Sequence, residues 1–290
     1  MDNPYVQYMY SYPHKTAYGP LSGIRLEDYI QRLVGAQNSL YFHIPFCQSK
    51  CGYCNLFSVT GQSDEFMSAY VDAMERQAEQ LRTIIPEGAD FSDLTLGGGT
   101  PLLLSEKQLQ RVFSIARDRM GFEVETIIVE TSPAQTTEEK AALLKENGVT
   151  RVSMGVQSFD DAELRALNRC HRPEQVHRAA RILKKSKFPC INLDLIYGIP
   201  GQTVESLLDS ARQAAAYEPE EMFVYPLYIK KGTFLAGRVT LDPEAVYEMY
   251  QELRDFLKSR GYKQLSMRRF VKDPDSLNGG SCGFENTISI

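Results

Sequence analysis

The chain of 290 residues has no tryptophan, only four histidines and no long hydrophobic segment. No apolar run approaches the roughly 20 residues that a helix needs to cross a bilayer, which argues against a membrane-spanning protein. The first residues lack the basic and then apolar regions of an export signal. The net charge is −5 and the basic residues are scattered, whereas nucleic-acid-binding proteins concentrate positive charge on one surface. These absences favour a cytoplasmic protein without nucleic-acid or membrane partners.

Cysteine is also scarce, but half of the cysteines lie close together. Six cysteines are too few for the disulfide scaffold of a secreted protein, and Cys47, Cys51 and Cys54 fall within eight residues as CxxxCxxC. Thiolates are the ligands of iron–sulfur clusters, and a [4Fe–4S] cube normally takes one for each iron. Three thiolates leave one iron open to bind another molecule, as a catalytic metal site requires. The pattern predicts a redox enzyme with such a cluster.

A structural zinc ion is the alternative for these cysteines, with His43 as a fourth ligand. Structural zinc is usually bound by CxxC pairs separated by a longer loop, so the spacing favours iron. We expect the cysteines that share no ligand-like spacing to be buried thiols: Cys170, Cys190 and Cys282. We expect three histidines to be solvated and without a functional role: His14, His171 and His177.

Short apolar runs rich in β-branched residues recur along the chain, and each is followed by a stretch with a helical pattern. Short runs that are almost continuously apolar are typical of strands in a parallel sheet covered by helices. The predicted strands span residues 39–44, 92–97, 126–131, 150–155, 190–197 and 222–228.

The helical stretches have readable ends. Residues 105–108 and 136–139 fit the capping box, in which Ser105 and Thr136 would satisfy the first free backbone N–H groups. Gly121 and Gly148 fall where the helices that follow these boxes should end. The other predicted helices span about residues 64–84, 160–168, 173–187, 203–217 and 243–260.

Six β-then-α units in sequence imply parallel strands joined by right-handed crossovers. Six units are too few for a closed eight-unit barrel, so we predict an α/β fold with a partial, open (β/α)6 TIM-like barrel. A doubly wound sheet is the alternative, because the order of elements is the same in both. We expect residues 1–38 to form an N-terminal extension and residues 39–235 the core. Residues 236–290 would form a C-terminal helix and the start of a further, truncated domain.

In a parallel barrel the functional groups gather where the strands end. Three glycines at 97–99 follow the second strand, and their lack of side chains leaves a bare ledge for a small polar ligand. Glu130 ends the third strand, and Asp194 lies within the otherwise apolar fifth. Two carboxylates would favour a cationic ligand, and Arg169 would suit a carboxylate on that ligand. A buried carboxylate is costly, so Asp194 should also have a partner.

Together these motifs resemble those of the radical S-adenosylmethionine (SAM) enzymes. More narrowly, they are similar to the oxygen-independent coproporphyrinogen III oxidase branch, which also includes heme chaperones and methyltransferases. The matching segments are YFHIPFC at 41–47, GGGTP at 97–101, GVQSF at 155–159, Asn168-Arg169, and NLDLIYGIP at 192–200. The resemblance covers roughly residues 39–235 and implies the radical SAM core barrel.

The resemblance implies that Cys47, Cys51 and Cys54 hold a [4Fe–4S] cluster whose open iron binds the amino and carboxylate groups of SAM. An electron from a donor such as flavodoxin or ferredoxin would pass through the cluster and cleave SAM to a 5′-deoxyadenosyl radical. That radical would abstract hydrogen from a small-molecule substrate, a tetrapyrrole or related metabolite of porphyrin biosynthesis. By motif position, the cofactor-binding residues would be Tyr41, Tyr53, Gly98, Gly99, Thr100, Glu130, Gln157, Arg169 and Asp194. No residue is assigned a catalytic role.

The chain departs from two subgroups of this branch. The oxidases have a further cysteine two positions after the third, where this chain has Leu56. The heme chaperones carry a His-Asn…Tyr-Trp motif near the position of Cys282-Gly-Phe-Glu-Asn, but this chain has no tryptophan and no histidine beyond His177. We therefore expect a radical SAM oxidoreductase, with methyl transfer as another possible reaction. The alternative is a non-catalytic protein that binds cluster and heme.

Overall fold

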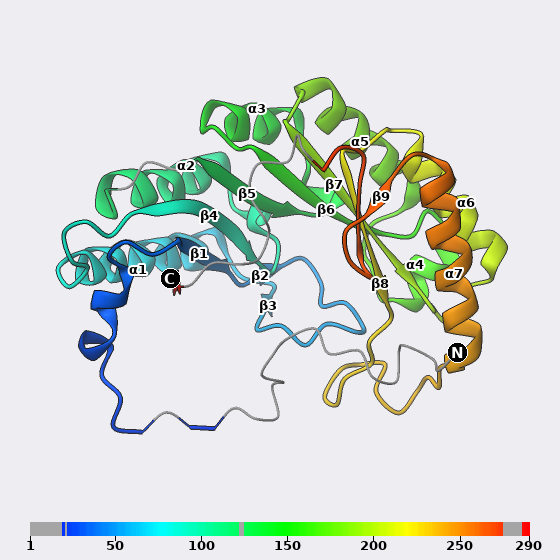
Figure 1. Cartoon of the computed structure of the whole chain (residues 1–290), viewed down its shortest axis with the longest axis horizontal. Helices are drawn as coiled ribbons and strands as arrows, with labels where there is room; N and C mark the ends of the chain where they lie inside the picture. The colour runs from blue at the N-terminus through cyan, green and yellow to red at the C-terminus, as the bar shows by residue number, and fades with distance from the viewer. Residues whose placement is uncertain (1–18, 21, 122–124, 275–285) are drawn as a thin grey trace.

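The computed structural model describes residues 19–20, 22–121, 125–274 and 286–290. Its centre is a nine-stranded sheet in the order β11-β1-β4-β5-β6-β7-β8-β10-β9 (Figure 1). The six central strands are β1 (Asn38–Ile44), β4 (Phe91–Gly98), β5 (Thr126–Thr131), β6 (Arg151–Gln157), β7 (Cys190–Tyr197) and β8 (Glu221–Pro226). All six are parallel and lie in chain order, which confirms the predicted strands.

Helices follow the strands and lie along the outside of the curved sheet (Figure 1). They are α1 (Asp64–Arg82), α2 (Glu106–Ser114), α3 (Glu138–Glu146), α4 (Asp161–Ala166), α5 (Pro173–Ser186), α6 (Val204–Ala215) and α7 (Pro243–Ser259). Within the described residues β11 and β9 are the two edges of the sheet and do not pair with each other. The predicted open α/β barrel is therefore confirmed. In the same part of the chain, no helix is both long enough and apolar enough to span a bilayer.

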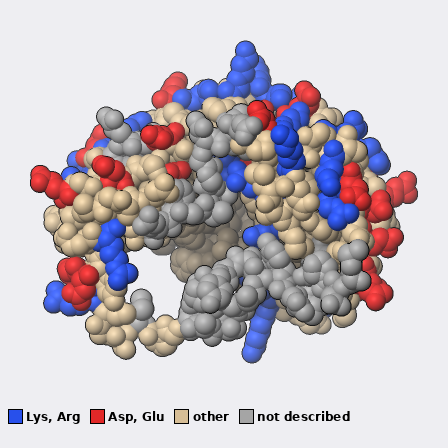
Figure 2. Space-filling model, viewed as in Figure 1, with Lys and Arg blue, Asp and Glu red and all other residues tan. Residues whose placement is uncertain are grey.

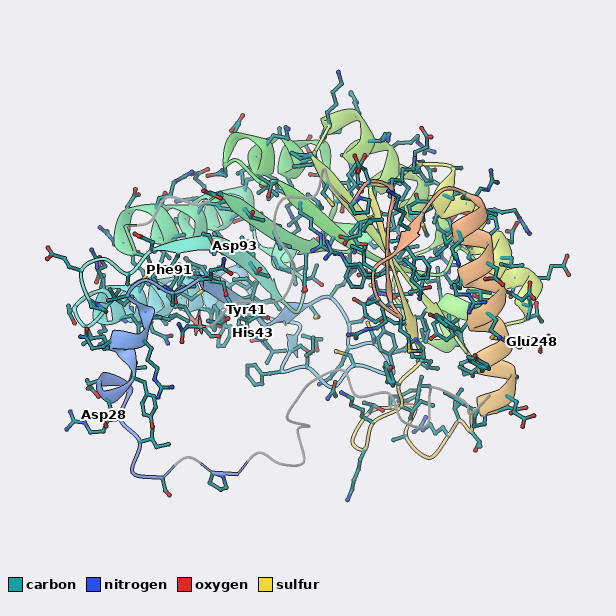
Figure 3. The ribbon with its side chains drawn as sticks, viewed as in Figure 1. Asp28, Tyr41, His43, Phe91, Asp93 and Glu248 are labelled. Carbon is teal, nitrogen blue, oxygen red and sulfur yellow. The ribbon has the colours of Figure 1, made fainter. Side chains whose placement is uncertain are left out.

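Alternation along β1 shows how the sheet separates core from site. Side chains in a strand point to opposite faces in turn. Leu40, Phe42 and Ile44 are fully buried in the hydrophobic core. The intervening Tyr41 and His43 are partly exposed and lie at the carboxyl end of β1 (Figure 3). The apolar positions therefore pack under the helices, while the polar ones face the inside of the barrel.

The capping box at Ser105 is confirmed, because the Ser105 hydroxyl accepts from Gln108 N and the Gln108 side chain accepts from Ser105 N. The box predicted at Thr136 is wrong by one residue. Thr137 caps α3 by accepting a hydrogen bond from Lys140 N. Thr136 is buried and donates its hydroxyl to Ser132 O at 3.0 Å, so it is not available as a cap.

Both ends of the chain contribute to the barrel. Ile30 and Leu33 of the N-terminal extension are buried in the core. Near the other end, β9 (Lys263–Gln264) and β10 (Arg269–Val271) extend the sheet antiparallel from β8, and β11 (Asn286–Ser289) pairs with β1 in parallel. The division of the chain at residues 38 and 235 stays a prediction. His14 and Cys282 lie outside the described residues.

The charged side chains show no single-sign patch on the face seen in Figure 2. Lysine and arginine alternate there with aspartate and glutamate over the helices. Exposed ion pairs among the described residues include Arg165 with Asp161 and Lys185 with Glu138. Such pairs add little stability, and a mixed surface of this kind is the ordinary solvated outside of a globular protein.

Candidate metal and cofactor site

The three clustered cysteines lie on a loop that a small parallel sheet closes. Cys47 is in β2 (Phe46–Cys47), which pairs with β3 (Val59–Thr60), and Val59 N donates to Pro45 O at 2.8 Å. Residues 48–58 between these strands form what we call the cysteine loop. Within it, Cys54 N donates to Cys51 O at 3.1 Å, which makes a tight turn between the second and third thiols. The loop is thus fixed at both ends and folded in the middle.

The glycine triplet after β4 packs directly on the start of β2. Gly99 N donates to Ile44 O at 2.8 Å, and a Cβ on Gly99 would lie only 2.6 Å from Phe46 O. Gly98 has a φ of +111°, and a Cβ there would lie 2.6 Å from the His43 ring. The absence of side chains is therefore required by the packing of the chain itself. This close packing of the glycines also places Thr100 Oγ1 at 4.0 Å from Cys47 Sγ.

Two carboxylates lie inside the barrel without an ion pair in the described part of the chain. Glu130 accepts a hydrogen bond from Gly98 N at 3.2 Å, and Asp194 accepts one from Asn192 Nδ2 at 2.7 Å. Desolvation by the surrounding protein raises the pKa of Glu130, even though the cavity described below keeps this side chain accessible. Burial also raises the pKa of Asp194, to about 7, against the opposing effect of the Asn192 hydrogen bond. Both groups therefore favour a cation nearby.

Gln157 sits at an irregularity where β6 pairs with β7, and its φ is +71°. A left-handed conformation in a residue other than glycine is uncommon and is typical of functional sites. Gly155 makes room for it, because a Cβ there would lie 2.8 Å from Gln157 Nε2. Arg169 lies over the same glycine and donates through Nη2 to Gly155 O at 2.5 Å. Its Nη1 donates to Cys51 Sγ at 3.0 Å, and among the described residues its Nε has no partner.

His43 is not a fourth ligand in this structure. Its Nε2 lies 3.0 Å from Phe57 O, a pure acceptor, so Nε2 carries the proton and Nδ1 accepts from Tyr41 OH at 3.0 Å. Both nitrogens are therefore occupied. Among the described residues, no three histidine, cysteine or carboxylate side chains are arranged to hold a single metal ion. Both observations disfavour the zinc alternative.

A cavity of about 220 Å³ collects the predicted site residues at the carboxyl ends of the strands. Eleven of the twelve predicted residues line it: Cys47, Cys51, Tyr53, Cys54, Gly98, Gly99, Thr100, Glu130, Gln157, Arg169 and Asp194. Tyr41 does not line this cavity. It lies next to Glu130 across Gly97, since a Cβ on Gly97 would be about 3 Å from both the Tyr41 ring and the Glu130 carboxylate. Desolvation, Glu130 and Tyr70 raise the pKa of Tyr41 to about 12.

A second cavity of about 440 Å³ adjoins the first and shares its wall at Tyr53, Cys54 and Asp194. Its outer part is aromatic and basic: Tyr225, Tyr228, Lys230 and Arg268. Phe223 stacks on Tyr225 with ring centroids 5.7 Å apart, and the Arg268 guanidinium lies 5.4 Å from the Tyr225 centroid. No motif in the sequence predicted this cavity, because these residues come from β8, from the loop after it and from the loop before β10.

Two expectations about side chains near the site are wrong. His171 is only 2% exposed and its Nε2 bonds to Val156 O at 3.1 Å; burial and Arg169 lower its pKa to about 3, so it is neutral. Cys170 is exposed rather than buried, and its thiol reaches Gln48 Oε1 on the cysteine loop at 3.6 Å. Both line the first cavity, because the chain turns back toward the site after α4. Cys190 is buried as expected, and His177 is half-buried against Tyr217 OH.

The residues fit a cationic, thiolate-bound group. Burial raises the pKa of Cys47, the Thr100 hydroxyl opposes this, and Cys51 and Cys54 raise it further. Three thiolates cannot form side by side without a positive partner, and metal ions are the usual one. Desolvation raises the pKa values of Glu130 and Asp194, and neither carboxylate forms an ion pair with a described residue, so a cationic ligand would stabilise the ionised form of both. An iron–sulfur cluster and a sulfonium ligand would both supply positive charge.

Comparisons with known proteins agree with this geometry. The sequence profile of the Radical SAM superfamily matches residues 41–214. The chain is 32% identical over 266 residues to the heme chaperone HemW of Lactococcus lactis, covering 87% of this chain and 65% of that protein. It is 30% identical over 285 residues to the oxygen-independent coproporphyrinogen III oxidase of Escherichia coli, covering 93% of this chain and 62% of that protein.

The solved structure of the Escherichia coli coproporphyrinogen III oxidase HemN, which its title calls a radical SAM enzyme, superposes with a TM-score of 0.81. The two chains are 27% identical, and the match covers 93% of this chain and 64% of that one. The chain therefore spans less than two thirds of the length of these relatives.

Proposed function

The chain belongs to the radical SAM superfamily, and on that premise we propose that it is an enzyme that uses a [4Fe–4S] cluster and SAM to act on a tetrapyrrole or a related metabolite. The observation that carries this proposal is the first cavity. It brings to one place three thiols, a bare glycine ledge and two carboxylates that form no ion pair with a described residue. These are the groups that a thiolate-bound cluster and a zwitterionic sulfonium ligand require.

In this proposal Cys47, Cys51 and Cys54 hold the cluster. Gly98, Gly99 and Thr100 line the methionine end of SAM, and Tyr53 lies beside the adenine. Glu130 and Asp194 balance the positive charges of SAM. Gln157 and Arg169 contact SAM or the molecule that lies behind it. Tyr41 supports the base of the site through its hydrogen bond to His43 and its position beside Glu130.

When bound, the cluster and SAM supply one-electron reductive cleavage of SAM, with the electron coming from a small reduced electron-transfer protein, and hydrogen abstraction from the substrate. The residues of this chain orient the reactants and exclude water. Gly99 N donates to Ile44 O at the end of β1 and Thr100 N donates to Phe46 O in β2, both at 2.8 Å, so the ledge lies directly beside Cys47. Arg169 Nη1 donates to Cys51 Sγ at 3.0 Å, which places a guanidinium beside the cysteines that would hold the cluster.

The adjoining second cavity is the proposed place of the substrate. It is about twice as large as the first, and it opens from the wall formed by Tyr53 and Asp194. Aromatic side chains suit a flat conjugated ring, and Lys230 and Arg268 suit its acidic substituents. The relatives named for coproporphyrinogen support a tetrapyrrole, and they support an oxidoreductase reaction over methyl transfer.

A second candidate function is a carrier of cluster and heme without turnover. The observation that favours it is the 32% identity to a heme chaperone. The chain lacks tryptophan altogether, which removes one residue of the chaperone motif, so the enzyme is the better supported of the two.

Turnover of SAM separates the two candidates. Protein reconstituted without oxygen with iron and sulfide, then reduced with dithionite and given SAM, should release 5′-deoxyadenosine and methionine in equal amounts. The Asp194→Asn variant, carried through the same reconstitution, should bind iron but release several-fold less of both products.

A carrier would instead bind the cluster and leave SAM intact. It would also show a saturable shift of the heme absorption band on titration with hemin. That pair of results would replace the enzyme by the carrier.

A further inference from the structure

The turn that follows α4, residues 167–170, contacts the cysteine loop through four consecutive residues. The contacts are Leu167 O with Gly52 N at 2.8 Å, Asn168 Nδ2 with Lys50 O at 2.9 Å, Arg169 Nη1 with Cys51 Sγ at 3.0 Å, and Cys170 Sγ with Gln48 Oε1 at 3.6 Å. The two segments are more than 100 residues apart in sequence. We call residues 167–170 the α4 turn.

Asn168 gives this turn its shape. Its φ is +54°, a left-handed conformation that asparagine adopts more readily than other residues with side chains. The turn closes α4, since Asn168 N donates to Arg165 O and Arg169 N donates to Leu164 O. The same turn directs the Asn168 amide to the carbonyl of Lys50, between the first two cysteines. One residue therefore ends the helix and holds the loop.

Glu163 in turn fixes α4, which is only six residues long and too short to be stable by itself. Its carboxylate is 4% exposed and forms no ion pair with any residue that the structure describes. It accepts hydrogen bonds from Ser158 Oγ at 2.6 Å, Ser206 Oγ at 2.6 Å and Gln202 Nε2 at 3.0 Å. These donors stand at the end of β6 and at the start of α6.

The same network reaches the loop after β7. Gln202 Oε1 accepts from Gly198 N at 2.8 Å and Ile199 N at 3.2 Å. A buried carboxylate that accepts several hydrogen bonds is held rigidly. Any movement that breaks one of these bonds leaves an oxygen lone pair without a donor and without water, which costs free energy. The position of α4, and with it the α4 turn, is therefore set by the rigid carboxyl ends of two strands.

We propose that Glu163 and Asn168 are positioning residues that hold the cysteine loop in its cluster-binding shape before any cluster is present. Glu163 fixes α4 on the barrel. Asn168, at the end of α4, then holds Lys50 and the neighbouring Cys51 in place through its hydrogen bond to Lys50 O. Loading of iron and sulfide is then fast, because the loop does not have to be ordered during binding. This inference rests on the proposed function only for the identity of the group that the cysteines bind.

The Asn168→Gly variant tests the Asn168 step most cleanly. Glycine adopts a φ of +54° without strain, so the substitution removes only the hydrogen bond to Lys50 O. In the metal-free protein, we expect amide hydrogen exchange in peptides covering residues 48–54 to be at least fivefold faster than in the wild type. The initial rate of cluster formation, followed at 410 nm during reconstitution, should fall several-fold, whereas the spectrum of the fully loaded protein should not change.

Arg165→Ala is the matched control, because Arg165 lies on the exposed side of α4 and, of the residues that the structure describes, its side chain pairs only with Asp161. It should leave both exchange and loading unchanged. Glu163→Gln tests the other step while keeping the size of the side chain. It should accelerate exchange in the loop and also at Gly198 and Ile199.

The inference is overturned if Asn168→Gly and Glu163→Gln exchange like the wild type in the loop, or if loading slows without any change in exchange. Failure of the proposed function is a separate result. In that case the wild-type protein takes up no cluster at all, while the exchange comparison in the metal-free protein still decides the role of the α4 turn.

Discussion

At the amino ends of the strands, Glu221 of β8 is completely buried between Arg151 and Arg269, whose side chains are 12% and 14% exposed. At the carboxyl ends, Glu130 and Asp194 face the same interior of the same barrel, and neither has an ion pair among the described residues. Arg151 and Asp194 lie on neighbouring strands only a few residues apart along them. The barrel thus carries compensated charge at one end and uncompensated charge at the other.

The difference shows which end can bind a ligand. A buried carboxylate between two arginines already has its charge balanced, and removing either partner is costly. A carboxylate held by one amide in a cavity retains the capacity to bind a cation. Burial raises the pKa of Asp194 to about 7, so a cationic ligand would stabilise the ionised form of this carboxylate. The amino ends of the strands, which we call the lower end, therefore stabilise the barrel. The carboxyl ends, which we call the upper end, are where a ligand can bind.

Removing a thiol should have the largest effect at the upper end. The Cys51→Ser variant should fold normally but retain almost no iron after reconstitution and desalting, because only two thiolates remain and serine is a poor ligand for iron. Iron and sulfide per chain measure the outcome. Cys190→Ser, at the buried lower end, is the control, and it should keep a full complement of iron.

Removing the lower carboxylate should have the largest effect on stability. Glu221→Gln leaves Arg151 and Arg269 buried without a counter-charge, so the free energy of unfolding in urea should fall by about 3–5 kcal/mol. Glu248→Gln on the exposed face of α7 (Figure 3) should change it by less than about 0.5 kcal/mol. A loss at Glu221 as small as at Glu248 would remove the distinction between the two ends.

The matching change at the upper end should spare stability and weaken binding. Asp194→Asn keeps the shape and removes a charge, and a hydrogen bond to a charged group contributes about 1.5–3 kcal/mol, so SAM affinity should fall about 10- to 100-fold. Equilibrium dialysis of the reconstituted protein with SAM measures this. An unchanged affinity, together with an intact cluster, would place Asp194 outside the ligand contacts.

Acid pH should stabilise the metal-free protein through the same residue. The pKa of Asp194 is raised from 3.8 to about 7 in the folded state, so between these values the folded chain holds a proton that the unfolded chain has lost. Stability should therefore fall as the pH rises from about 4 to about 7, with this group contributing a slope of up to about 1.4 kcal/mol per unit. Urea unfolding of the wild type and of Asp194→Asn should differ by that slope, and parallel curves would contradict it.

The smallest effect is expected at Tyr41. The Tyr41→Phe variant removes the hydroxyl that donates to His43 Nδ1, which should lower the free energy of unfolding by about 1 kcal/mol. Iron content should stay the same, because His43 still donates to Phe57 O. A loss of iron in this variant would instead indicate that Tyr41 takes part in cluster binding.

Local patterns predicted much of this molecule, because they depend on neighbours in sequence. The CxxxCxxC spacing placed three thiols on one loop, and the apolar runs placed the strand ends that carry Glu130 and Asp194. Contacts between distant segments were not predictable in this way. The pairing of β1 with β11 joins residues about 250 apart, and the hydrogen bond from Asn192 Nδ2 to Ser153 Oγ forms only once β6 and β7 are aligned.

The misplaced side chains have the same cause. Cys170 was expected to be a buried thiol because it shares no ligand-like spacing, and His171 was expected to be solvated. The left-handed Asn168 turns the chain back toward the site, so His171 enters the barrel wall and Cys170 stands at the mouth of the cavity. The φ angle of Asn168 therefore determines the positions of both His171 and Cys170, and no periodic pattern in the sequence predicts this angle.

The electron paramagnetic resonance spectrum of the reconstituted, reduced protein, recorded with and without SAM, tests the central claim most directly. Three thiols beside two carboxylates that form no ion pair with a described residue predict a [4Fe–4S]⁺ signal whose g values shift when SAM is added, and Asp194→Asn should require more SAM for the same shift. A cluster signal that does not respond to SAM at any concentration would contradict the assignment of the upper end of the barrel as a SAM site.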